Sequence, residues 1–407
     1  MTMVSIIIPL AIIYGDAIIP DFFIQPRFDQ ANGFHCGMAR ITINRDKSGP
    51  PLYGYIDMTG KEIIPQKYPA AREYSEGFAA VYYEDEWGTP RVGYINKNGE
   101  FIYKSEFEVS GGIFSSHGND DVPALHDFHC GRALIEQKNY GPVYIDTNGK
   151  IVIDKSANKP LDDMARSAFN GDFSENLAVF SFYVKNKSGS GSKYYSPPPI
   201  YGYIDLKGNF VIKPQFAEAL NFSEGMAIVK TNGTWAYQII NNKGQVIKTL
   251  PADVSLESKK FSDGLLKFKK NGRYGFFDKT GNIAIQPKFE EVTEFHEGLA
   301  RVKTFSIENN ETLYGYINTK GDLIIKPNKS ILPCHGEKGD FVNGYAIIKE
   351  KGLKMPYGFI DKTGNVVLKP AFINLENVYE GVAAACNELV IRDLYENFGY
   401  IKMPQAP

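Results

Sequence analysis

Two short stretches of the chain place a histidine next to a cysteine in the same surroundings. They read FHCGMARI (Phe34 to Ile41) and FHCGRALI (Phe128 to Ile135). Imidazole and thiolate groups bind zinc, and a thiol beside an imidazole can act as a nucleophile. Zinc needs about four ligands converging at roughly 2.3 Å from one point, and adjacency in sequence does not provide nucleophile geometry. We therefore expect no metal site and no thiol catalysis here, and interpret both pairs as variants of a turn.

Acidic residues recur in a second pattern, in which Asp or Asn is followed three residues later by Gly. Five of the eight copies begin with Asp and three with Asn, as in DMTG and NKNG. A turn accepts this mixture, because either side chain can receive hydrogen bonds from the turn backbone while Gly supplies a positive φ. A general acid or a charged calcium ligand would not accept it. The pattern predicts structural turns at Asp57, Gly60, Asn96, Gly99, Asp146, Gly149, Asp205, Gly208, Asp278, Gly281, Asn318, Gly321, Asp361 and Gly364.

Composition excludes several functional classes. The 407 residues include 45 basic and 47 acidic side chains, interspersed along the chain, so the charge distribution is not that of a nucleic-acid-binding protein. Aromatic residues make up 13%, which favours a folded, strand-rich protein. No phosphate-binding loop, dinucleotide fingerprint or HExxH motif occurs, and we expect no cofactor. The four cysteines form no CxxC pair and predict no disulfide framework: Cys36, Cys130, Cys334 and Cys386.

The turns belong to a longer repeat. YGYIDMTGKEIIPQKY (Tyr53 to Tyr68) returns as YGYIDLKGNFVIKPQF (Tyr201 to Phe216) and YGFIDKTGNVVLKPAF (Tyr357 to Phe372). A second motif, best seen in FSEGMAIVK and FHEGLARVK, precedes each copy. The spacing of about forty residues is typical of repeat architectures. Each unit therefore predicts three short strands: an EGxAxV strand, a GYID strand and a GxxxIxPxF strand.

These motifs resemble the WG-repeat (KWG-repeat) family, whose unit reads roughly G-x-W-G-[YF]-I-D-x-x-G-x-x-[IV]-x-P-x-[YF]. The resemblance covers nearly the whole chain. The tryptophan of the family is mostly Tyr or Phe here, and Trp235 is followed by Ala236 instead of Gly. What the resemblance implies is a bacterial β-repeat protein that serves interactions and has no catalytic residues.

We expect an all-β fold of nine repeats in a single domain (1–407), each repeat with three to four short antiparallel strands. The closing segment 1–28 ends in FFIQPRF, a third strand without a second before it, and 373–407 supplies a first and second strand without a third. Together they complete one repeat, so a propeller-like closed ring is favoured over an open β-solenoid. Successive WG-type repeats occupy 29–372. Insertions interrupt them at 105–127, 154–172 and 185–200, and a helical turn is expected at 161–168.

The opening stretch MTMVSIIIPLAIIYGDAIIP is apolar. A secretory signal needs basic residues before its apolar core, and the first Lys or Arg here is Arg27. A membrane span needs about 20 apolar residues, and two prolines, a glycine and an aspartate interrupt this stretch. We therefore expect a strand at the seam of the ring and a cytoplasmic protein without a membrane span, with export as the alternative.

Function is expected where the repeats differ, because their shared positions build the fold. The connection between the EGxAxV and GYID strands varies most, and these loops should emerge at one edge. We expect a non-catalytic binding or scaffold protein that contacts another protein there. Recognition of glycan or peptidoglycan at the cell envelope, and a hydrolase with an unrecognised carboxylate site, are the alternatives. The candidate contact residues are Trp87, Arg91, Lys193, Tyr194, Tyr195 and Phe305.

Overall fold

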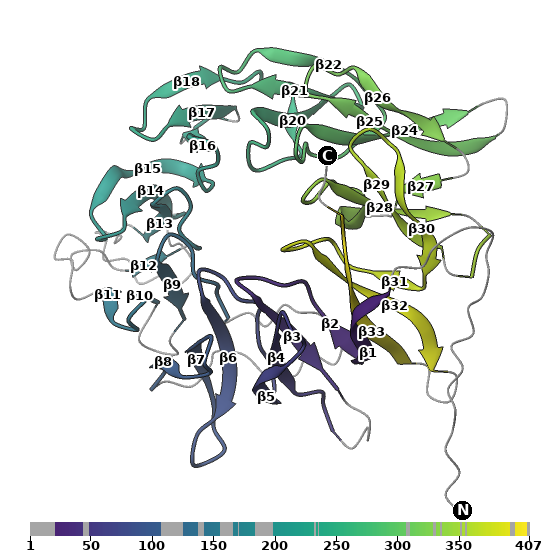
Figure 1. The fold of residues 1–407 in the computed structure, drawn as a ribbon. Coiled ribbons are helices and arrows are strands. Elements are labelled where there is room, and N and C mark those ends of the chain that lie inside the picture. Colours follow the sequence, from purple (N-terminus) through teal and green to yellow (C-terminus); the bar gives the residue numbers. More distant parts are fainter. Residues whose placement is uncertain are drawn as a thin grey trace, which may run out of the picture.

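The protein forms a β-propeller, in which small antiparallel sheets follow one another around a central opening (Figure 1). Among the described residues the one helical segment is a 3-10 turn, η1 (Gly336–Gly339). No helix in this part of the chain is long and apolar enough to cross a membrane. The computed structural model describes residues 21–43, 49–106, 125–136, 142–154, 166–169, 171–183, 198–231, 233–234, 236–306, 310–328, 331–333, 336–350, 352–354, 356–390 and 395–404.

One unit illustrates how the repeat folds. The EGxAxV segment forms β3 (Met38–Thr42), the GYID segment forms β4 (Tyr53–Asp57) and the IxPxF segment forms β5 (Glu62–Tyr68). They pair antiparallel in chain order, and the two-residue strand β2 (Gln30–Ala31) adds to the other side of β3. β3 is buried throughout because both of its faces lie between neighbouring sheets, whereas β5 alternates between exposed and buried residues.

The other strands repeat this scheme. In the first half of the ring they are β6 (Phe78–Glu84), β7 (Pro90–Asn96), β8 (Phe101–Lys104), β9 (Arg132–Ile135), β10 (Val143–Asp146), β11 (Ile151–Ile153), β12 (Arg166–Phe169), β13 (Leu177–Tyr183), β14 (Ile200–Asp205) and β15 (Phe210–Ala219). In the second half they are β16 (Met226–Thr231), β17 (Tyr237–Asn241), β18 (Val246–Thr249), β19 (Ser255–Leu256), β20 (Leu265–Lys270), β21 (Arg273–Asp278), β22 (Ile283–Phe289), β23 (Glu291–Val292), β24 (Leu299–Ser306), β25 (Glu311–Asn318), β26 (Leu323–Asn328), β27 (Ile331–Pro333), β28 (Tyr345–Glu350), β29 (Tyr357–Asp361) and β30 (Val366–Phe372).

The ring closes through its two ends. The strand β1 (Phe22–Phe28), which contains FFIQPRF, pairs antiparallel with β33 (Tyr395–Lys402). The same sheet holds β32 (Val382–Val390) and β31 (Asn374–Leu375), so three strands come from the C-terminal part and one from the N-terminal part. The prediction of a closed ring is confirmed. The further expectation of a strand within VSIIIPLAII lies outside the described residues.

The described strands group into eight sheets, whereas the sequence predicts nine repeats. The difference arises in the seven-stranded sheet from β12 to β18, which contains two repeats. Strand β15 continues beyond the IxPxF motif, and its Glu218 and Ala219 pair with Lys230 and Val229 of β16. Two neighbouring repeats are thereby hydrogen-bonded into one sheet.

The insertions are described only in part. In 154–172, the helical turn expected at 161–168 is wrong for residues 166–168, which lie in β12 (Arg166–Phe169) and pair with β13; residues 161–165 lie outside the described residues. The strand β13 offers an open edge there, and backbone pairing with it satisfies the hydrogen bonds that a helical turn would otherwise make locally. Most of 105–127 and 185–200 lies outside the described residues.

The core lies between neighbouring sheets, and the repeat motifs supply it. In one cluster, Ile24 and Tyr400 of the closing sheet pack with Ile41 of the next sheet. An aromatic pair recurs at successive interfaces: the GYID aromatic of one unit meets the aromatic before the EG motif of the next. Their ring centroids are 4.8 Å apart for Tyr203 and Phe222. Such pairs contribute about 0.5–1.5 kcal/mol each beyond the area they bury.

Candidate functional site

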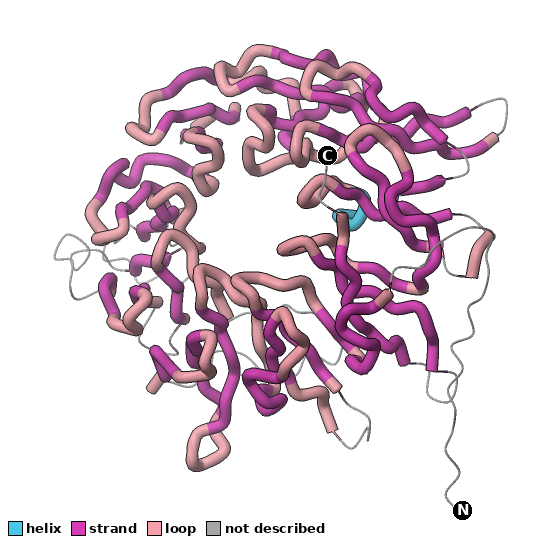
Figure 2. The backbone as a smooth tube through the Cα atoms, viewed as in Figure 1, coloured by secondary structure: helices cyan, strands magenta, loops and turns pink. Residues whose placement is uncertain are grey.

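Loops and turns line the central opening of the ring (Figure 2). In the turn from Ser75 to Phe78, the N–H of each of these two residues donates to the carbonyl of the other. The central residues Glu76 and Gly77 have φ of 51° and 90°, which defines a type I′ turn. Nine turns of this form directly precede the EGxAxV strands of the described chain, and we call them the inner turns: Cys36–Gly37, Glu76–Gly77, Cys130–Gly131, Glu175–Asn176, Glu224–Gly225, Asp263–Gly264, Glu297–Gly298, Asn343–Gly344 and Glu380–Gly381.

Acidic side chains of the inner turns reach the next inner turn along the ring. The Glu76 carboxylate accepts hydrogen bonds from the N–H groups of Cys130 and Gly131 at 2.8 and 2.7 Å. Glu380 accepts from Gly37 N–H at 2.9 and 3.1 Å, which joins the last unit to the first. Six of the nine turns carry such an acid: Glu76, Glu175, Glu224, Asp263, Glu297 and Glu380.

Serines of the inner turns make a second link to the next unit. The hydroxyl of Ser75 donates to the Phe128 carbonyl at 2.7 Å, and Ser174 and Ser223 do the same to Phe222 and Phe261. The S-E-G sequence therefore makes two kinds of hydrogen bond to the next unit. Its serine and its acid both hold the neighbouring unit, which explains why these residue types recur.

Buried tyrosines make the third link. The GYID tyrosine Tyr203 donates its hydroxyl hydrogen to the Leu220 carbonyl of the next unit at 2.6 Å. Burial raises the pKa of this hydroxyl strongly, so it stays protonated and remains a donor at neutral pH. The tyrosines with this bond to the next unit are Tyr55, Tyr94, Tyr144, Tyr203, Tyr316 and Tyr400.

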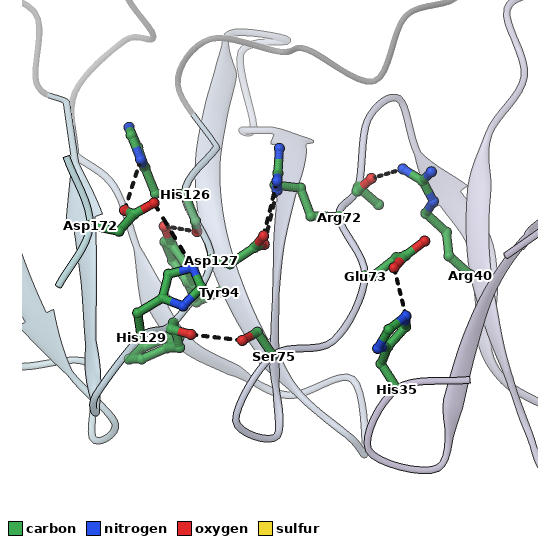
Figure 3. A network of polar contacts seen from close by, with 12 residues as sticks. His35, Arg40, Arg72, Glu73, Ser75, Tyr94, His126, Asp127, His129 and Asp172 are labelled. Atoms are coloured by element: carbon green, nitrogen blue, oxygen red, sulfur yellow. Dashed lines mark hydrogen bonds and ion pairs between the residues drawn. The ribbon is translucent and has the colours of Figure 1, made fainter. Parts of the chain in front are cut away.

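The two His-Cys pairs lie in inner turns, as the sequence predicts. Cys36 and Cys130 occupy the position of the acid, and Cys130 Sγ accepts the N–H of Asn176 in the next inner turn at 3.4 Å. The imidazole beside each cysteine lies near an acid of the next unit. His35 Nε2 lies 2.9 Å from Glu73, and His129 Nε2 lies 4.0 Å from Asp172 (Figure 3). In the described part of the chain, no three His, Cys, Asp or Glu side chains converge as metal ligands.

A denser group of charges surrounds His126 (Figure 3). Its Nδ1 bonds to Asp172 at 3.0 Å, and its Nε2 lies 3.8 Å from Glu136. Burial lowers the pKa of His126, but the two carboxylates outweigh burial and raise it to about 9. Nearby, Arg72 and Asp127 form a two-pronged ion pair with both distances at 2.9 Å. These charges compensate one another between neighbouring units, which favours a structural role over an acid–base one.

The sequence did not single out Arg72, His126, Asp127 or Asp172. Each lies one or two residues before the aromatic of an inner turn, at positions that vary between units. The available signal was a relation between units: His35 and His129 are each followed, one unit later, by an acid just before the aromatic. His296 repeats it, because its Nε2 lies 3.8 Å from Asp340.

The predicted structural turns have the geometry of Asx turns. In the first, Asp57 Oδ1 accepts the N–H groups of Thr59 and Lys61 at 2.8 and 3.1 Å. Asn96 Oδ1 does the same for the N–H groups two and four residues later, both at 3.0 Å. Asp and Asn are thus interchangeable in this turn. Although partial burial acts in the opposite direction, bonds from Thr59 and Lys61 lower the pKa of Asp57.

The turn glycines also allow neighbouring units to pack closely. Gly321 has φ of 83°, and a β-carbon there would lie 3.1 Å from Ile285 of the preceding unit. Gly364 has the same relation to Ile325 at 2.9 Å. The Ile of IxPxF therefore rests on the turn glycine of the next unit, so the glycine is needed for both its φ and its missing side chain.

Trp87 is the most prominent of the predicted contact residues, with 81% of its surface exposed. It lies in a second Asx turn, DEWG, between β6 and β7. Asp85 Oδ1 accepts the N–H groups of Trp87 and Thr89 at 3.0 and 2.8 Å. Arg91 fixes this turn through Asp85 Oδ2 at 2.9 Å and the Glu106 carbonyl at 2.7 Å. Arg91 thus positions Trp87 and is itself engaged.

The other predicted contact residues are spread along the ring. Phe305 in β24 is 51% exposed and pairs with Thr312 in β25. The β6–β7 and β24–β25 hairpins both project outward, at separate places (Figure 1). Lys193, Tyr194 and Tyr195 lie outside the described residues.

The chain was compared with known families, proteins and structures. The model for the WG-containing repeat matches residues 21–45, 53–87, 201–235, 274–304, 314–328 and 357–388. The chain therefore carries repeats of the WG-containing family at six places. No curated protein sequence matches it significantly.

Solved structures match the chain at low sequence identity and with TM-scores below 0.5. A structure described as the eukaryotic initiation factor is 10% identical, with 94% of this chain and 92% of that chain covered and a TM-score of 0.47. BamB from Moraxella catarrhalis is 9% identical, with coverage of 95% and 99% and a TM-score of 0.37. The β-propeller domain of the Trilobed protease from Pyrococcus furiosus is 10% identical, with coverage of 76% and 100% and a TM-score of 0.36.

Proposed function

We propose that this WG-repeat protein is a non-catalytic binding or scaffold protein that contacts another protein through its loop edge. The loop edge comprises the connections between the EGxAxV and GYID strands, such as β3–β4, β6–β7, β20–β21 and β24–β25. The observation that carries the proposal is Trp87, a large aromatic side chain that is 81% exposed on a turn with a defined backbone.

Several features support this assignment. Tryptophan is among the residues that contribute most at protein interfaces, since it buries a large area at a small cost in side-chain entropy. The Asp85 turn and the Arg91 ion pair fix the backbone before binding, which lowers the cost of ordering it further. Phe305 adds a second exposed aromatic on the same edge.

The inner turns suit catalysis less well than they suit structure. Their carboxylates accept backbone N–H groups of the next unit, so their lone pairs are occupied in holding the ring together. We place the protein in the cytoplasm as part of this proposal, because the thiols of Cys36 and Cys130 are not joined in a disulfide.

The test is partner capture with the full-length protein and its Trp87→Ala and Phe305→Ala variants. The matched control is Ile151→Ala, which removes a residue 41% exposed on β11, away from the loop edge. Quantitative mass spectrometry should find proteins held by the wild type and the control but depleted at least about tenfold with Trp87→Ala.

Equal capture by all four proteins would contradict the proposal. Sedimentation with insoluble peptidoglycan provides the second readout. If Trp87→Ala abolishes sedimentation while protein capture stays unchanged, the glycan alternative replaces the protein-binding one.

A further inference from the structure

The outer strands of four consecutive units carry exposed aliphatic side chains. The strands β18, β22, β26 and β30 each end their sheet on one side, and they follow one another around the outside of the ring (Figure 1). With the turns that precede them, we call these strands the outer rim. The residues at the same position after each turn are exposed by 39–51%: Val246, Ile283, Leu323 and Val366. A single exposed aliphatic side chain is ordinary on a protein surface. Exposure of the same position in four successive units instead produces a repeated apolar surface.

The outer rim is continuous from one unit to the next. The third position of β18, β22 and β26 packs on the turn glycine of the following unit. Lys248 lies against Gly281, Ile285 against Gly321, and Ile325 against Gly364. Each outer strand therefore lies directly beside the next turn, and the exposed aliphatics form one band along the ring.

The outer rim is also basic, although the whole chain has a net charge of −2. Its segments 241–249, 278–289, 318–328 and 361–372 contain eight lysines and three acids. Two of these acids, Asp278 and Asp361, accept hydrogen bonds within their own turns. Within the described chain, no ion pair joins Lys243, Lys326 or Lys369 to an acid.

The shape of the band decides between two kinds of acidic partner. The outer rim runs around the outside of a ring and is convex, so a flat membrane would touch only part of it at once (Figure 1). An extended polypeptide can follow the curve and bring acids to several lysines and apolar side chains to several aliphatics. It can also pair with the open backbone edges of the outer strands.

We propose that the outer rim binds an extended acidic segment of a partner protein, with apolar residues between its acids. This surface is separate from the loop edge. Binding should weaken as salt is raised, because the attraction is between partly exposed charges.

The probe is a synthetic peptide of about 16 residues in which Glu and Asp alternate with Val and Leu. A peptide with Lys in place of every acid serves as its control. Binding to the full-length protein is measured by fluorescence anisotropy. The rim variant combines Lys243→Glu, Lys326→Glu and Lys369→Glu. The matched control reverses three lysines on the third strands of other units, β5, β8 and β15: Lys67→Glu, Lys104→Glu and Lys213→Glu.

We expect the acidic peptide to bind at least about tenfold more tightly than the basic one, and the rim variant to lose at least about tenfold in affinity. The control variant and Trp87→Ala should bind the peptide as the wild type does, which separates this proposal from that on the loop edge. Hydrogen exchange should show added protection in β18, β22, β26 and β30.

Three results would overturn the proposal. Equal affinity for the acidic and basic peptides would show that the surface does not select acidic residues. An equal loss of affinity in the rim and control variants would show that the peptide does not bind at the outer rim. Rim-dependent binding to vesicles with anionic lipid, with no binding of the peptide, would make a membrane the partner.

Discussion

The inner turns and the loop edge have similar local structure but different roles: the inner turns bind the next unit, and the loop edge exposes side chains to solvent. Both contain tight turns with glycine at positive φ, as at Gly77 and Gly88. In the inner turns the side chains reach the next unit, as Glu76 does with Gly131. On the loop edge, the Asp85 carboxylate bonds to a backbone N–H of its own turn and to Arg91 of the same unit. Trp87 in this turn is exposed to solvent.

This difference shows how the repeat divides its work. An inner turn keeps its length and most of its residue types, because its partners belong to another unit. The Asp85 turn on the loop edge bonds within its own unit, so a loop-edge connection can differ in length. It shrinks to the two-residue Asn271–Gly272 turn between β20 and β21, and elsewhere it extends through the five residues from Asp85 to Thr89.

Removal of β1 should have the largest effect, because β1 joins the two ends of the ring. A chain lacking residues 2–28 loses the strand that pairs with β33 and the buried Ile24 and Phe28. We expect unfolding or oligomerisation, because the closing sheet is left with an open apolar edge. Size-exclusion chromatography and thermal melting measure this. A truncated protein that stays monomeric with an unchanged melting temperature would show that the seam does not hold the ring.

Two glycine substitutions compare a turn that packs on the neighbouring unit with a turn on the loop edge. Gly321→Ala combines a strained φ with a contact to Ile285, and should lower the free energy of unfolding by about 2–4 kcal/mol. Gly88→Ala has φ of 74° and open space around it, and should cost only about 1–2 kcal/mol. Denaturant unfolding measures both. Equal costs would mean that the contact between units contributes little.

Tyr203→Phe removes one hydroxyl and leaves the Leu220 carbonyl without this donor. We expect a loss of about 1–2 kcal/mol in the free energy of unfolding. The variant should still fold, since Phe276 and Phe359 occupy the same position in other units. A stability equal to that of the wild type would argue against the tyrosine link.

The His126 cluster predicts a smaller, pH-dependent effect. The pKa of His126 rises from 6.5 to about 9 on folding, so its contribution is fully present below pH 6.5 and is lost as pH rises through 9. His126→Gln should therefore destabilise the protein more at pH 6 than at pH 10. Denaturant unfolding at both pH values gives the comparison. A pH-independent difference would mean that the imidazole charge does not stabilise the interface.

Much of the fold could be predicted from the sequence because its signals are local. The DMTG-type turns, the alternation in β5 and the missing third strand at the C-terminus each reflect a few neighbouring residues. The pairing of β1 with β33 was predicted because the N-terminal segment has a third strand only and the C-terminal segment has a first and second strand only. The repeat count differs from the sheet count because β15 extends into pairing with β16, which depends on how two units sit together.

The site was harder to predict because its contacts join residues of different units. The bonding partners of Glu76, Ser75 and Tyr94 lie about one repeat away, and no local sequence pattern identifies those partners. Trp87 was found because it is a large aromatic in a loop of variable length. Arg91 was predicted as a contact residue because it lies in the same variable loop, but its ion pair with Asp85 gives it a positioning role.

The division of labour between the inner turns and the loop edge can be tested in one protein. Residues 84–90 are replaced with Asn-Gly, which copies the natural connection of Lys270 to Arg273 and removes Trp87. Melting temperature and partner capture are then measured together. The account predicts a melting temperature within about 2 °C of the wild type and a loss of the captured partners. A large fall in melting temperature with all partners retained would contradict it.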